Sequence, residues 1–560
     1  MKRERILAFV LSACFLLGIL AGCGDKTPAN SPANSPESSP PVSSPSNSPG
    51  SSAAGPSWPG LPRDGVKYTA PPAGAKLADE VRVIMGNTSI VVMDPFKPAG
   101  NNQEVKQIAM MLYDRLLNLA DDNSLLPELA AKWDAGDYQT YSFTLRDDVY
   151  FHNGEKLTSS DVEWTIQQAL AGAGSGAFDV WALVDSVKVI DALNFQIVLK
   201  AVNVNFLFNL ARPMAAIVSK KAMTDDPENG AMYGASGAYK VNEFVSGDYI
   251  RLQRNDKWWN KANMPVTEFF LYKFFPEQAA RALNVLNGEY HFSYGAPPED
   301  VPSFESAPDK YAVYASVFNN PQSLVFNLTD PLMADKNFRL AVLHALDKEE
   351  IALIAAGKWA YPDSESGNLW GLYTEFRNPN IQPYKYDLEL AKKYLKESSY
   401  AGQEVELVTA IITNVKAAEV IKSQLEDIGI KVRVNEMDMG GFAGYTKYGN
   451  TQAQMVLQSI SMAVAAGTAR SGFTPGGGQN RASYDNPEIT ALFDEADRTS
   501  DPIKRRDIYY KIQQIIMDDA IGTNVFWRVG NLVAQSKTGG MILPPYNERN
   551  DMRGMYFVLS

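Results

Sequence analysis

Residues 141–162, YSFTLRDDVYFHNGEKLTSSDV, hold the densest set of local folding signals in the chain. The first five residues alternate apolar and polar side chains, a period of two that is typical of a half-buried strand. Asn153-Gly154 favours a tight hairpin turn. The segment Thr158–Asp161 supplies N-cap candidates for a helix over Val162–Leu170. The stretch therefore predicts a strand, a turn and a helix in succession, and its residues are scaffold rather than binding site.

Further elements appear on both sides of this stretch. Val81–Met85 predicts a buried first strand, and Phe195–Leu199 alternates like a second half-buried one. Asn337–Leu346 places its apolar residues on one helical face. The clearest unit is Ala417–Val434, a helix pattern followed by alternating strand residues, with Gly429 suited to a left-handed C-terminal cap between them. A helix that leads into a strand in this way indicates α/β architecture.

The N-terminus has the pattern of a secretory leader. A short basic start precedes the apolar run Ile6–Leu20, which is too short to span a membrane but fits a signal peptide. The run ends in Leu20–Cys23 (LAGC), which resembles the lipobox of bacterial lipoproteins. We therefore expect residues 1–22 to be a lipoprotein signal peptide and Cys23 to carry the lipid anchor.

The segment that follows Cys23 predicts a tether. Residues 27–60 consist mainly of Ser, Pro, Asn, Gly and Ala, a composition that cannot bury enough apolar surface to fold. We assign residues 23–77 to the lipid-anchor cysteine and a disordered tether. Cys14 and Cys23 are the two cysteines of the chain. Since Cys14 lies in the leader, the mature chain has no second cysteine for a disulfide.

Composition argues against several functions. The net charge of -12 disfavours nucleic acid and anionic membrane surfaces as main partners. None of the three histidines (His152, His291 and His344) is spaced as a metal ligand from another His or from a Cys. The sequence also lacks the G-x-S-x-G, Walker A and H-E-x-x-H motifs. We therefore expect no metal, no cofactor and no enzymatic activity, although a pair of glycosidase-like carboxylates stays an open alternative.

Short segments in a fixed order carry a family resemblance. Besides residues 141–162 they are Tyr113–Leu117, Leu126–Ala130, Trp133, Gly237–Lys240, Arg254–Trp259, Leu286–Tyr290, Phe326-Asn327, Phe338–Ala341, Ala345–Lys348, Tyr484–Glu488 and Arg505–Tyr509. Together they resemble the oligopeptide- and dipeptide-binding proteins of bacterial ABC importers, the solute-binding proteins of family 5. Each segment alone is short, but so many in the same order are specific. The resemblance covers the chain from about Ala78 to the C-terminus.

The resemblance implies an α/β fold with two lobes, like the type II fold of periplasmic binding proteins. It assigns residues 78–318 to the first lobe, including an extra subdomain at about 105–225. Residues 319–512 form the second lobe, and residues 513–560 return to the first. Crossover strands join the lobes, which close on the ligand about a hinge.

The family also implies a role and partners. We expect a lipid-anchored binding protein on the extracellular face of the cell membrane. It captures a solute, with a peptide as the leading choice, and delivers it to the permease and ATPase subunits of an ABC importer. The family is monomeric as a rule, so we expect a monomer. A sensory receptor and a secreted hydrolase on the same fold stay open as alternatives.

The predicted ligand contacts are positions that align with the contact segments of the family. They are Tyr294, Gly295, Ala296, Asn327, Ser459, Ile460, Ser461 and Met462. The first three are expected to present backbone and ring at the cleft. Asn327 follows a crossover strand, and the last four are expected to form the opposite wall.

The identity of the ligand is less constrained. Peptide binders of this family commonly carry a Trp-x-x-Asp segment whose acid faces the α-amino group of the peptide, and a buried ammonium needs such a partner. The corresponding segment here, Ile460–Ala463, has neither residue, and Asp94-Pro95 is not followed by an acid. Either another carboxylate replaces the missing acid or the ligand has no free α-amine. Oligosaccharides are the leading alternative, with Trp181, Trp359, Trp370 and the many Tyr residues as possible ring platforms. Nickel chelates, opines and other small solutes stay open.

Overall fold

The computed structural model describes residues 66–86, 93–97, 103–120, 124–173, 175–318, 320–364, 368–371, 374–410, 412–460, 462, 465–543 and 550–559. Residues 48–560 form one compact unit. The predicted signal peptide, Cys23 and most of the predicted tether lie outside the described residues. Val66 pairs with Leu543 and Leu77 pairs with Val558. Val66 and Leu77 therefore pair with the C-terminal segment, ahead of the predicted start of the first lobe at residue 78.

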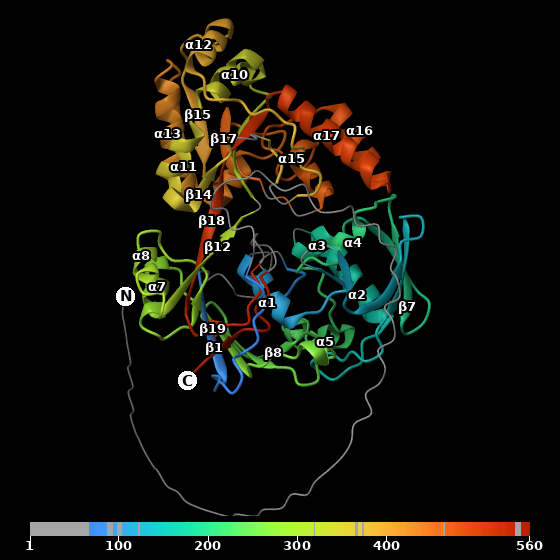
Figure 1. The fold of residues 1–560 in the computed structure, drawn as a ribbon. Helices are drawn as coiled ribbons and strands as arrows, with labels where there is room; N and C mark the ends of the chain where they lie inside the picture. The colour runs from blue at the N-terminus through green and yellow to red at the C-terminus, as the bar shows by residue number, and fades with distance from the viewer. Residues whose placement is uncertain are drawn as a thin grey trace, which may run out of the picture. The chain divides into compact units, whose positions relative to one another are not determined.

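Among the described residues, a twelve-stranded sheet forms the centre of the fold, in two halves that share one strand (Figure 1). The first half contains β8 (Tyr239–Val245), β9 (Tyr249–Arg254), β10 (Phe269–Phe274), β1 (Glu80–Met85), β11 (Phe292–Ser293) and β12 (Tyr311–Val317). Strand β1 lies parallel to both β10 and β11, and Val81 and Val83 are fully buried. The predicted buried first strand is confirmed.

The shared strand is β18 (Gly522–Gln535), the long red strand of Figure 1. Its first residues pair antiparallel with β13 (Gln322–Phe326) and β14 (Ala360–Pro362) of the second half. Its last residues pair with β12 and β11 of the first half. The chain thus crosses between the halves within β18 and at residues 318–321. This arrangement gives the expected two lobes, while the exact boundaries 78–318, 319–512 and 513–560 stay predictions.

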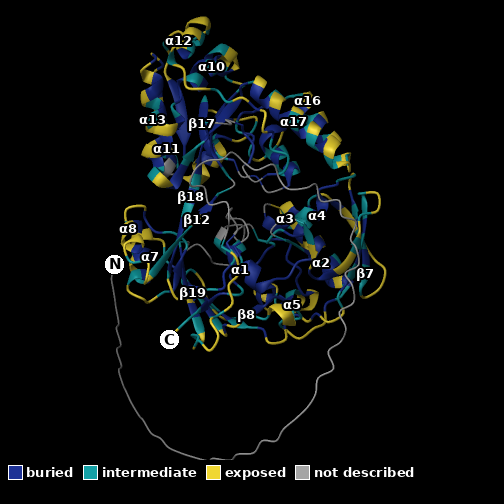
Figure 2. Ribbon diagram, in the orientation of Figure 1, coloured by how far each residue is buried: buried dark blue, intermediate teal, exposed yellow. Residues whose placement is uncertain are grey.

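The second lobe is a sheet covered on both faces. Its other strands are β15 (Val405–Thr409), β16 (Val432–Glu436) and β17 (Met455–Ser459). Its main helices are α10 (Lys336–Ala345), α11 (Lys348–Ala356), α12 (Leu388–Glu397), α13 (Ile412–Glu426), α16 (Pro487–Arg498) and α17 (Pro502–Asp518). Successive strand residues point to opposite faces. Leu407 therefore joins a core with α10–α13, while Val408 joins a second core with α16 and α17. Figure 2 shows the exposed outer sides of these helices in yellow.

The extra subdomain carries the stretch that opened the sequence analysis. An antiparallel sheet joins β4 (Ala130–Asp134), β5 (Thr140–Leu145), β7 (Asn194–Leu199) and β6 (Val184–Val189). Helices α2 (Ser159–Ala171) and α3 (Gly176–Trp181) pack with this sheet in a shared core. Phe143 of β5 stacks on Phe195 of β7 with 5.2 Å between ring centroids. The two predicted strands are confirmed.

The predicted local signals also act as expected. The amide and the hydroxyl of Thr158 both donate to Asp161 Oδ2, at 3.0 and 2.8 Å, and fix the start of α2. Gly154 has φ +89° in the turn before it, and Gly429 has φ +94° after α13. Both glycines therefore occupy the left-handed region that other residues avoid.

The remaining elements complete the two lobes. In the first lobe and its subdomain they are α1 (Gln103–Leu112), β2 (Leu117–Leu119), β3 (Leu125–Pro127), α4 (Phe206–Asn209), α5 (Lys220–Asp225), α6 (Gly230–Tyr233), α7 (Gln278–Leu286), α8 (Val301–Glu305), β19 (Thr538–Gly539) and β20 (Tyr556–Phe557). In the second lobe they are α9 (Pro331–Ala334), α14 (Met439–Tyr445) and α15 (Arg470–Phe473).

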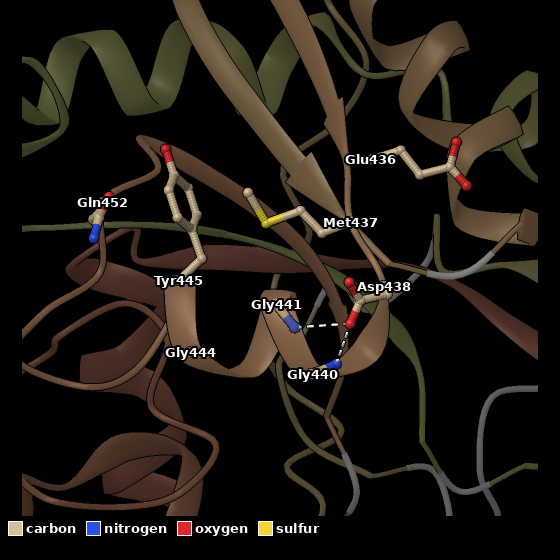
Figure 3. A pocket seen from close by; sticks show the side chains of 8 residues that line it. All are labelled: Glu436, Met437, Asp438, Gly440, Gly441, Gly444, Tyr445 and Gln452. Atoms are coloured by element: carbon tan, nitrogen blue, oxygen red, sulfur yellow. Dashed lines mark hydrogen bonds between the residues drawn. The ribbon is translucent and has the colours of Figure 1, made fainter. Parts of the chain in front are cut away.

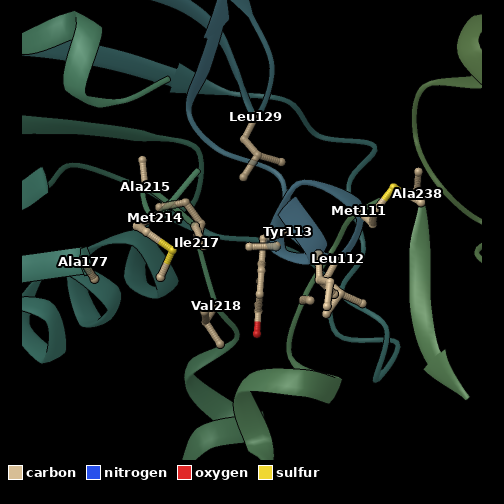
Figure 4. Close-up of a cluster of buried hydrophobic side chains, with 14 of the residues drawn as sticks. Met111, Leu112, Tyr113, Leu129, Ala177, Met214, Ala215, Ile217, Val218 and Ala238 are labelled. Carbon is tan, nitrogen blue, oxygen red and sulfur yellow. The ribbon is translucent and has the colours of Figure 1, made fainter. Parts of the chain in front are cut away.

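Several of the resemblance segments meet in the core of the first lobe, part of which is drawn in Figure 4 around Tyr113 and Leu129. The indole N–H groups of Trp258 and Trp259 both donate to Asp114. Burial raises the pKa of the Asp114 carboxyl to about 6. Next to it, the Arg115 guanidinium and the Glu128 carboxylate form a buried pair at 2.8 Å. These residues of the resemblance segments therefore stabilise the core of the first lobe.

Candidate ligand-binding site

The first wall of the candidate site is the turn that follows β11. Ser293 Oγ donates to the Gly295 carbonyl at 2.9 Å, and Gly295 has φ +99°. Asn531 of β18 forms hydrogen bonds with both backbone groups of Ala296. Its Oδ1 accepts from the Ala296 amide at 2.6 Å, and its Nδ2 donates to the Ala296 carbonyl at 3.0 Å. The shared strand therefore fixes the turn that carries Tyr294, Gly295 and Ala296.

These three residues differ in what they offer a ligand. Ala296 is fully buried in an apolar cluster beside β18 that also contains Phe304, Trp359 and Trp527, which we call the hinge core. The Tyr294 ring packs edge-on against Phe292 at 5.2 Å, and its hydroxyl is buried without a hydrogen-bond partner. Burial also raises the pKa of this phenol well above its ordinary value. Tyr294 therefore stays neutral and keeps an unused polar atom. The contact of Tyr294, Gly295 and Ala296 with a ligand stays a prediction.

The opposite wall lies at the end of β17. Ser459 Oγ accepts from Gln322 Nε2 at 3.1 Å, and the Oε1 atom of Gln322 is buried without a partner. Ile460 is a core residue, 2% exposed. Met462 is also buried, and its sulfur accepts the Gly371 amide at 3.1 Å. Ser461 lies outside the described residues. Of the predicted wall residues Ser459, Ile460 and Met462, Ser459 therefore places a polar side chain next to the crossing strands.

Asn327 is a turn residue in this structure, in contrast to the predicted ligand contact. Its Nδ2 donates to the Thr451 carbonyl at 2.9 Å. Its Oδ1 accepts from the amide and the hydroxyl of Thr329, at 3.2 and 2.7 Å. With its side chain 3% exposed and engaged at both ends, Asn327 shapes the exit from β13.

The predicted ring platforms are core residues, which corrects that expectation. Trp181 is fully buried and packs against Phe206 in the subdomain core. Trp370 is fully buried between Phe473 and Tyr509, and its N–H donates to the Glu375 carbonyl. Trp359 is 8% exposed and packs in the hinge core. None of the three offers an open ring face, because close packing of aromatic rings stabilises the fold here.

The structure reveals one acidic side chain that the sequence reasoning missed. Glu375 Oε2 is buried and has no hydrogen-bond partner, and burial raises the pKa of this carboxyl. The nearby Arg505 guanidinium lies over the Phe376 ring at 5.3 Å and partly offsets that rise. The Ala466 amide also donates to the Glu375 carboxylate. No sequence signal marks Glu375, since Ala466 and Arg505 lie far from it along the chain.

A polar network fixes the segment that carries Glu375. Asn524 of β18 accepts from Ser323 Oγ at 2.7 Å and donates to the Asn368 carbonyl. Asn368 Nδ2 in turn donates to Gln513 Oε1 at 2.7 Å, and Gln513 Nε2 donates to the Phe376 carbonyl at 2.7 Å. The position of Glu375 is therefore set by β13, β18 and α17 together.

Two surface pockets lie apart from these walls. The larger, of about 570 Å³, is drawn in Figure 3 and is lined by Glu436, Met437, Asp438, Gly440, Gly441, Gly444, Tyr445 and Gln452. Asp438 already accepts the first free amides of α14 there, so they are not available to a ligand. The smaller, of about 300 Å³, includes Asp94, whose Oδ2 lies 3.5 Å from Lys97 Nζ. Neither pocket contains a predicted contact residue.

No group of His, Cys, Asp and Glu side chains in the described ranges is arranged to hold a metal ion. No helix within those ranges is both long enough and apolar enough to cross a membrane.

The fold has two lobes joined by crossing strands, and each lobe places one wall of the candidate site at the end of a strand. This is the architecture of a two-lobed α/β binding protein of the type II class. The comparison with known families agrees. Residues 124–480, more than half of the chain, match the model of the bacterial extracellular solute-binding proteins, family 5 (middle region). The chain belongs to this family.

Curated relatives match over most of the chain. The glutathione-binding protein GsiB of Pectobacterium atrosepticum is 24% identical over 481 residues, which cover 82% of this chain and 91% of the relative. The glutathione-binding protein GsiB of Escherichia coli K12 is 21% identical over 477 residues, with the same coverage of 82% and 91%.

Solved structures share the fold. The substrate-binding protein CtaP of Listeria monocytogenes, from an ABC transporter, superposes with a TM-score of 0.75 at 22% identity, covering 86% of this chain and 100% of that chain. DppA of Helicobacter pylori, in complex with the peptide STSA, gives a TM-score of 0.70 at 20% identity, covering 86% and 98%. NikZ of Campylobacter jejuni, in complex with Ni(L-His), gives 0.72 at 18% identity, covering 85% and 99%.

Proposed function

We propose that this chain is the lipid-anchored receptor of an ABC importer and that it captures peptide-like ligands outside the cell. The observation that carries the proposal is the family match over residues 124–480, on a fold whose lobes are joined by crossing strands. Such a joint lets two rigid lobes close on a solute and open again. Capture and release of this kind break no bond, so the proposed role is binding and delivery to a permease and its ATPases.

The peptide assignment rests on relatives and on one side chain. Several relatives are glutathione-binding proteins, and glutathione is a tripeptide with a free ammonium group. A buried ammonium needs an anionic partner. Glu375 offers a buried carboxylate oxygen with no partner of its own. We propose that it replaces the acid that is missing from Ile460–Ala463. Trp181, Trp359 and Trp370 are buried, which disfavours them as ring platforms for a sugar.

A thermal-shift screen tests the ligand class. The full chain is melted with glutathione, with pools of dipeptides and tripeptides, and with oligosaccharides. A compound at 100 times its Kd adds about 2.7 kcal/mol to the free energy of unfolding, enough to shift the melt visibly. We expect shifts with the peptide probes and recovery of each probe intact. Shifts with oligosaccharides alone would overturn the peptide assignment but would leave the proposed role as the binding protein of an ABC importer.

Glu375→Gln tests the anchor. This near-isosteric change keeps the packing and removes the charge, so we expect at least about a tenfold weaker Kd for an amino-bearing peptide, since charge-assisted contacts contribute on the order of 1.5–3 kcal/mol. N-acetylation of the same peptide should weaken binding to the wild type but not further weaken binding to the variant. Glu495→Gln, an exposed site on α16, is the matched control. Equal loss with both variants would refute the assignment to Glu375.

The lipid anchor is tested at Cys23. When the full chain is expressed in a bacterium supplied with labelled palmitate, we expect label and membrane association with the wild type. Cys23→Ser should lose both. Membrane association that persists in Cys23→Ser would show a different mode of attachment.

A further inference from the structure

The extra subdomain touches the second lobe far from the crossing strands. The contact is made by residues 203–205, the loop between β7 and α4. The Val204 amide donates to the Asp497 carbonyl of α16 at 2.9 Å. Asn205 Nδ2 donates to Asp497 Oδ1 at 3.2 Å and lies 3.5 Å from Tyr509 Oη of α17. A backbone bond and two side-chain bonds therefore join the lobes at this point.

The subdomain holds its side of the contact rigidly. The Asn203 amide donates to the Tyr138 carbonyl at 2.9 Å, and Tyr141 Oη donates to the Asn203 carbonyl at 2.7 Å. Asn203 Oδ1 accepts the Asn205 amide at 3.0 Å. The next residue, Phe206, packs on the Tyr141 ring at 5.2 Å. The loop is thus presented as a fixed projection of the subdomain core.

The second lobe is shaped to receive this projection. Arg470 NH2 pairs with Asp497 Oδ2 at 3.1 Å and with Asp494 Oδ1 at 2.6 Å, which orients the Asp497 carboxylate. Gly467 provides the clearance, since a Cβ atom there would lie 2.9 Å from Asn205 Nδ2. A side chain at position 467 would therefore require Asn205 to shift.

The contact is incomplete in a way that suits repeated opening. Asn205 Oδ1 is buried and has no hydrogen-bond partner. An unsatisfied buried acceptor costs free energy, and part of the gain from the other bonds is lost. Burial also raises the pKa of the Asp497 carboxyl, a sign that closing removes this charge from water at a cost. These costs make the contact easier to break than a packed apolar one.

We propose that Asn205 and Asp497 form a releasable latch that holds the extra subdomain against the second lobe and keeps the closed state populated in the ligand-free protein. The latch opens and re-forms as the lobes move about the crossing strands. This inference rests on the hinge closure of the proposed function, but it does not depend on which ligand is bound.

Amide hydrogen exchange of the full chain, without ligand, tests the latch directly. The Val204 amide bonds across the lobes, while the Asn203 amide bonds within the subdomain. Their protection factors, resolved by fragmentation mass spectrometry, therefore separate latch opening from local unfolding. Asn205→Asp places two carboxylates face to face, so we expect the protection factor of Val204 to fall by about tenfold or more, because like charges repel at this distance. That of Asn203 should stay unchanged.

A charge-restoring double variant makes the test specific. In Asn205→Asp combined with Asp497→Asn, an amide again faces a carboxylate, so we expect the protection of Val204 to return to within about threefold of wild type. An unprotected Val204 amide in the wild type would overturn the proposal. So would normal protection in Asn205→Asp, or failure of the double variant to restore it. The experiment uses no ligand, so a negative ligand screen and a negative latch result remain distinguishable.

Discussion

Two contacts between the lobes, both within the described part of the chain, differ in the kinds of side chain that form them. Beside the crossing strands, Trp359 of the second lobe and Trp527 of β18 pack with Val285 and Phe304 of the first lobe in one apolar cluster. At the far side, Asn205 meets Asp497 through hydrogen bonds and a buried carboxylate. We call these the hinge core and the latch.

The difference follows from what each contact has to do. Opening an apolar contact exposes surface to water at about 25 cal/mol per Å², with no compensating bond. A polar contact exchanges its hydrogen bonds for bonds to water, so its net contribution is small. A joint that persists is therefore best built from Trp and Val, and a contact that opens and closes is best built from Asn and Asp. Four predictions test this comparison, from the largest effect to the smallest.

Trp527→Ala should break the hinge core. Trp527 is fully buried, and removal of such a side chain costs about 3–5 kcal/mol in the free energy of unfolding. Urea denaturation followed by circular dichroism measures the loss. Trp527→Phe is the matched control. The Trp527 N–H has no hydrogen-bond partner, so Phe at this position keeps an aromatic ring in the cluster and loses no hydrogen bond. We therefore expect a much smaller loss in the free energy of unfolding. Similar losses for both variants would show that the cluster is not tightly packed.

Asn524→Ala should lower the free energy of unfolding by more than Asn205→Ala, because the polar contact of Asn524 persists while the latch opens and closes. Asn524 is fully buried and bonds to Ser323 and to the Asn368 carbonyl. Its removal leaves both without partners, so we expect a loss of about 1–3 kcal/mol in the free energy of unfolding. The same urea experiment measures it. A loss no larger than that of Asn205→Ala would contradict the distinction.

Lowering the pH should tighten the latch and leave the hinge core unaffected. Burial raises the pKa of Asp497 in the latched state, although Arg470 partly offsets the rise. The latched state therefore binds a proton more tightly than a state in which this carboxyl faces water, and falling pH favours it. We expect the protection factor of Val204 to rise as the pH is lowered from neutral toward the ordinary pKa range of an aspartate. The rise should be absent in Asp497→Asn, which removes this group alone. A fall in wild-type protection would reverse the assignment.

Glu305→Gln should have the smallest effect, although it also removes a contact between the lobes. Lys358 Nζ lies 2.7 Å from Glu305 Oε1, but the two side chains are 55% and 43% exposed. Exposed ion pairs contribute about 0–1 kcal/mol and are screened by salt. Melting curves at low salt and at about 1 M salt should differ by less in the variant than in the wild type. A loss comparable with that of Trp527→Ala would contradict this ranking.

The sequence predicted the local elements well. The strands at 81–85, 141–145 and 195–199 and the helices at 162–170 and 337–346 all form, with ends shifted by a few residues. Gly154 and Gly429 adopt the positive φ values that their positions required. These features depend on residues that are close together in the sequence, so short stretches of sequence are enough to predict them.

The candidate site was predicted less well. Asn327 and the three predicted ring platforms are buried structural residues, because burial depends on which elements pack above a side chain. Alignment by segment placed Tyr294–Ala296 and Ser459 beside the crossing strands, but it did not reveal Glu375. The groups that act on its carboxyl, Ala466 and Arg505, lie far along the chain from it.

The sequence by itself indicated the α/β class, several of the strands and helices in their order, and the family resemblance. These depend on composition, on periodicity and on short motifs. Only the tertiary structure decided which tryptophans are core, which carboxylate stays unpaired and which loop touches the other lobe. Asn205 and Asp497 are 292 residues apart in the chain. No local pattern brings them together. Their contact exists because the subdomain core and the packing of α16 fix both side chains at one place.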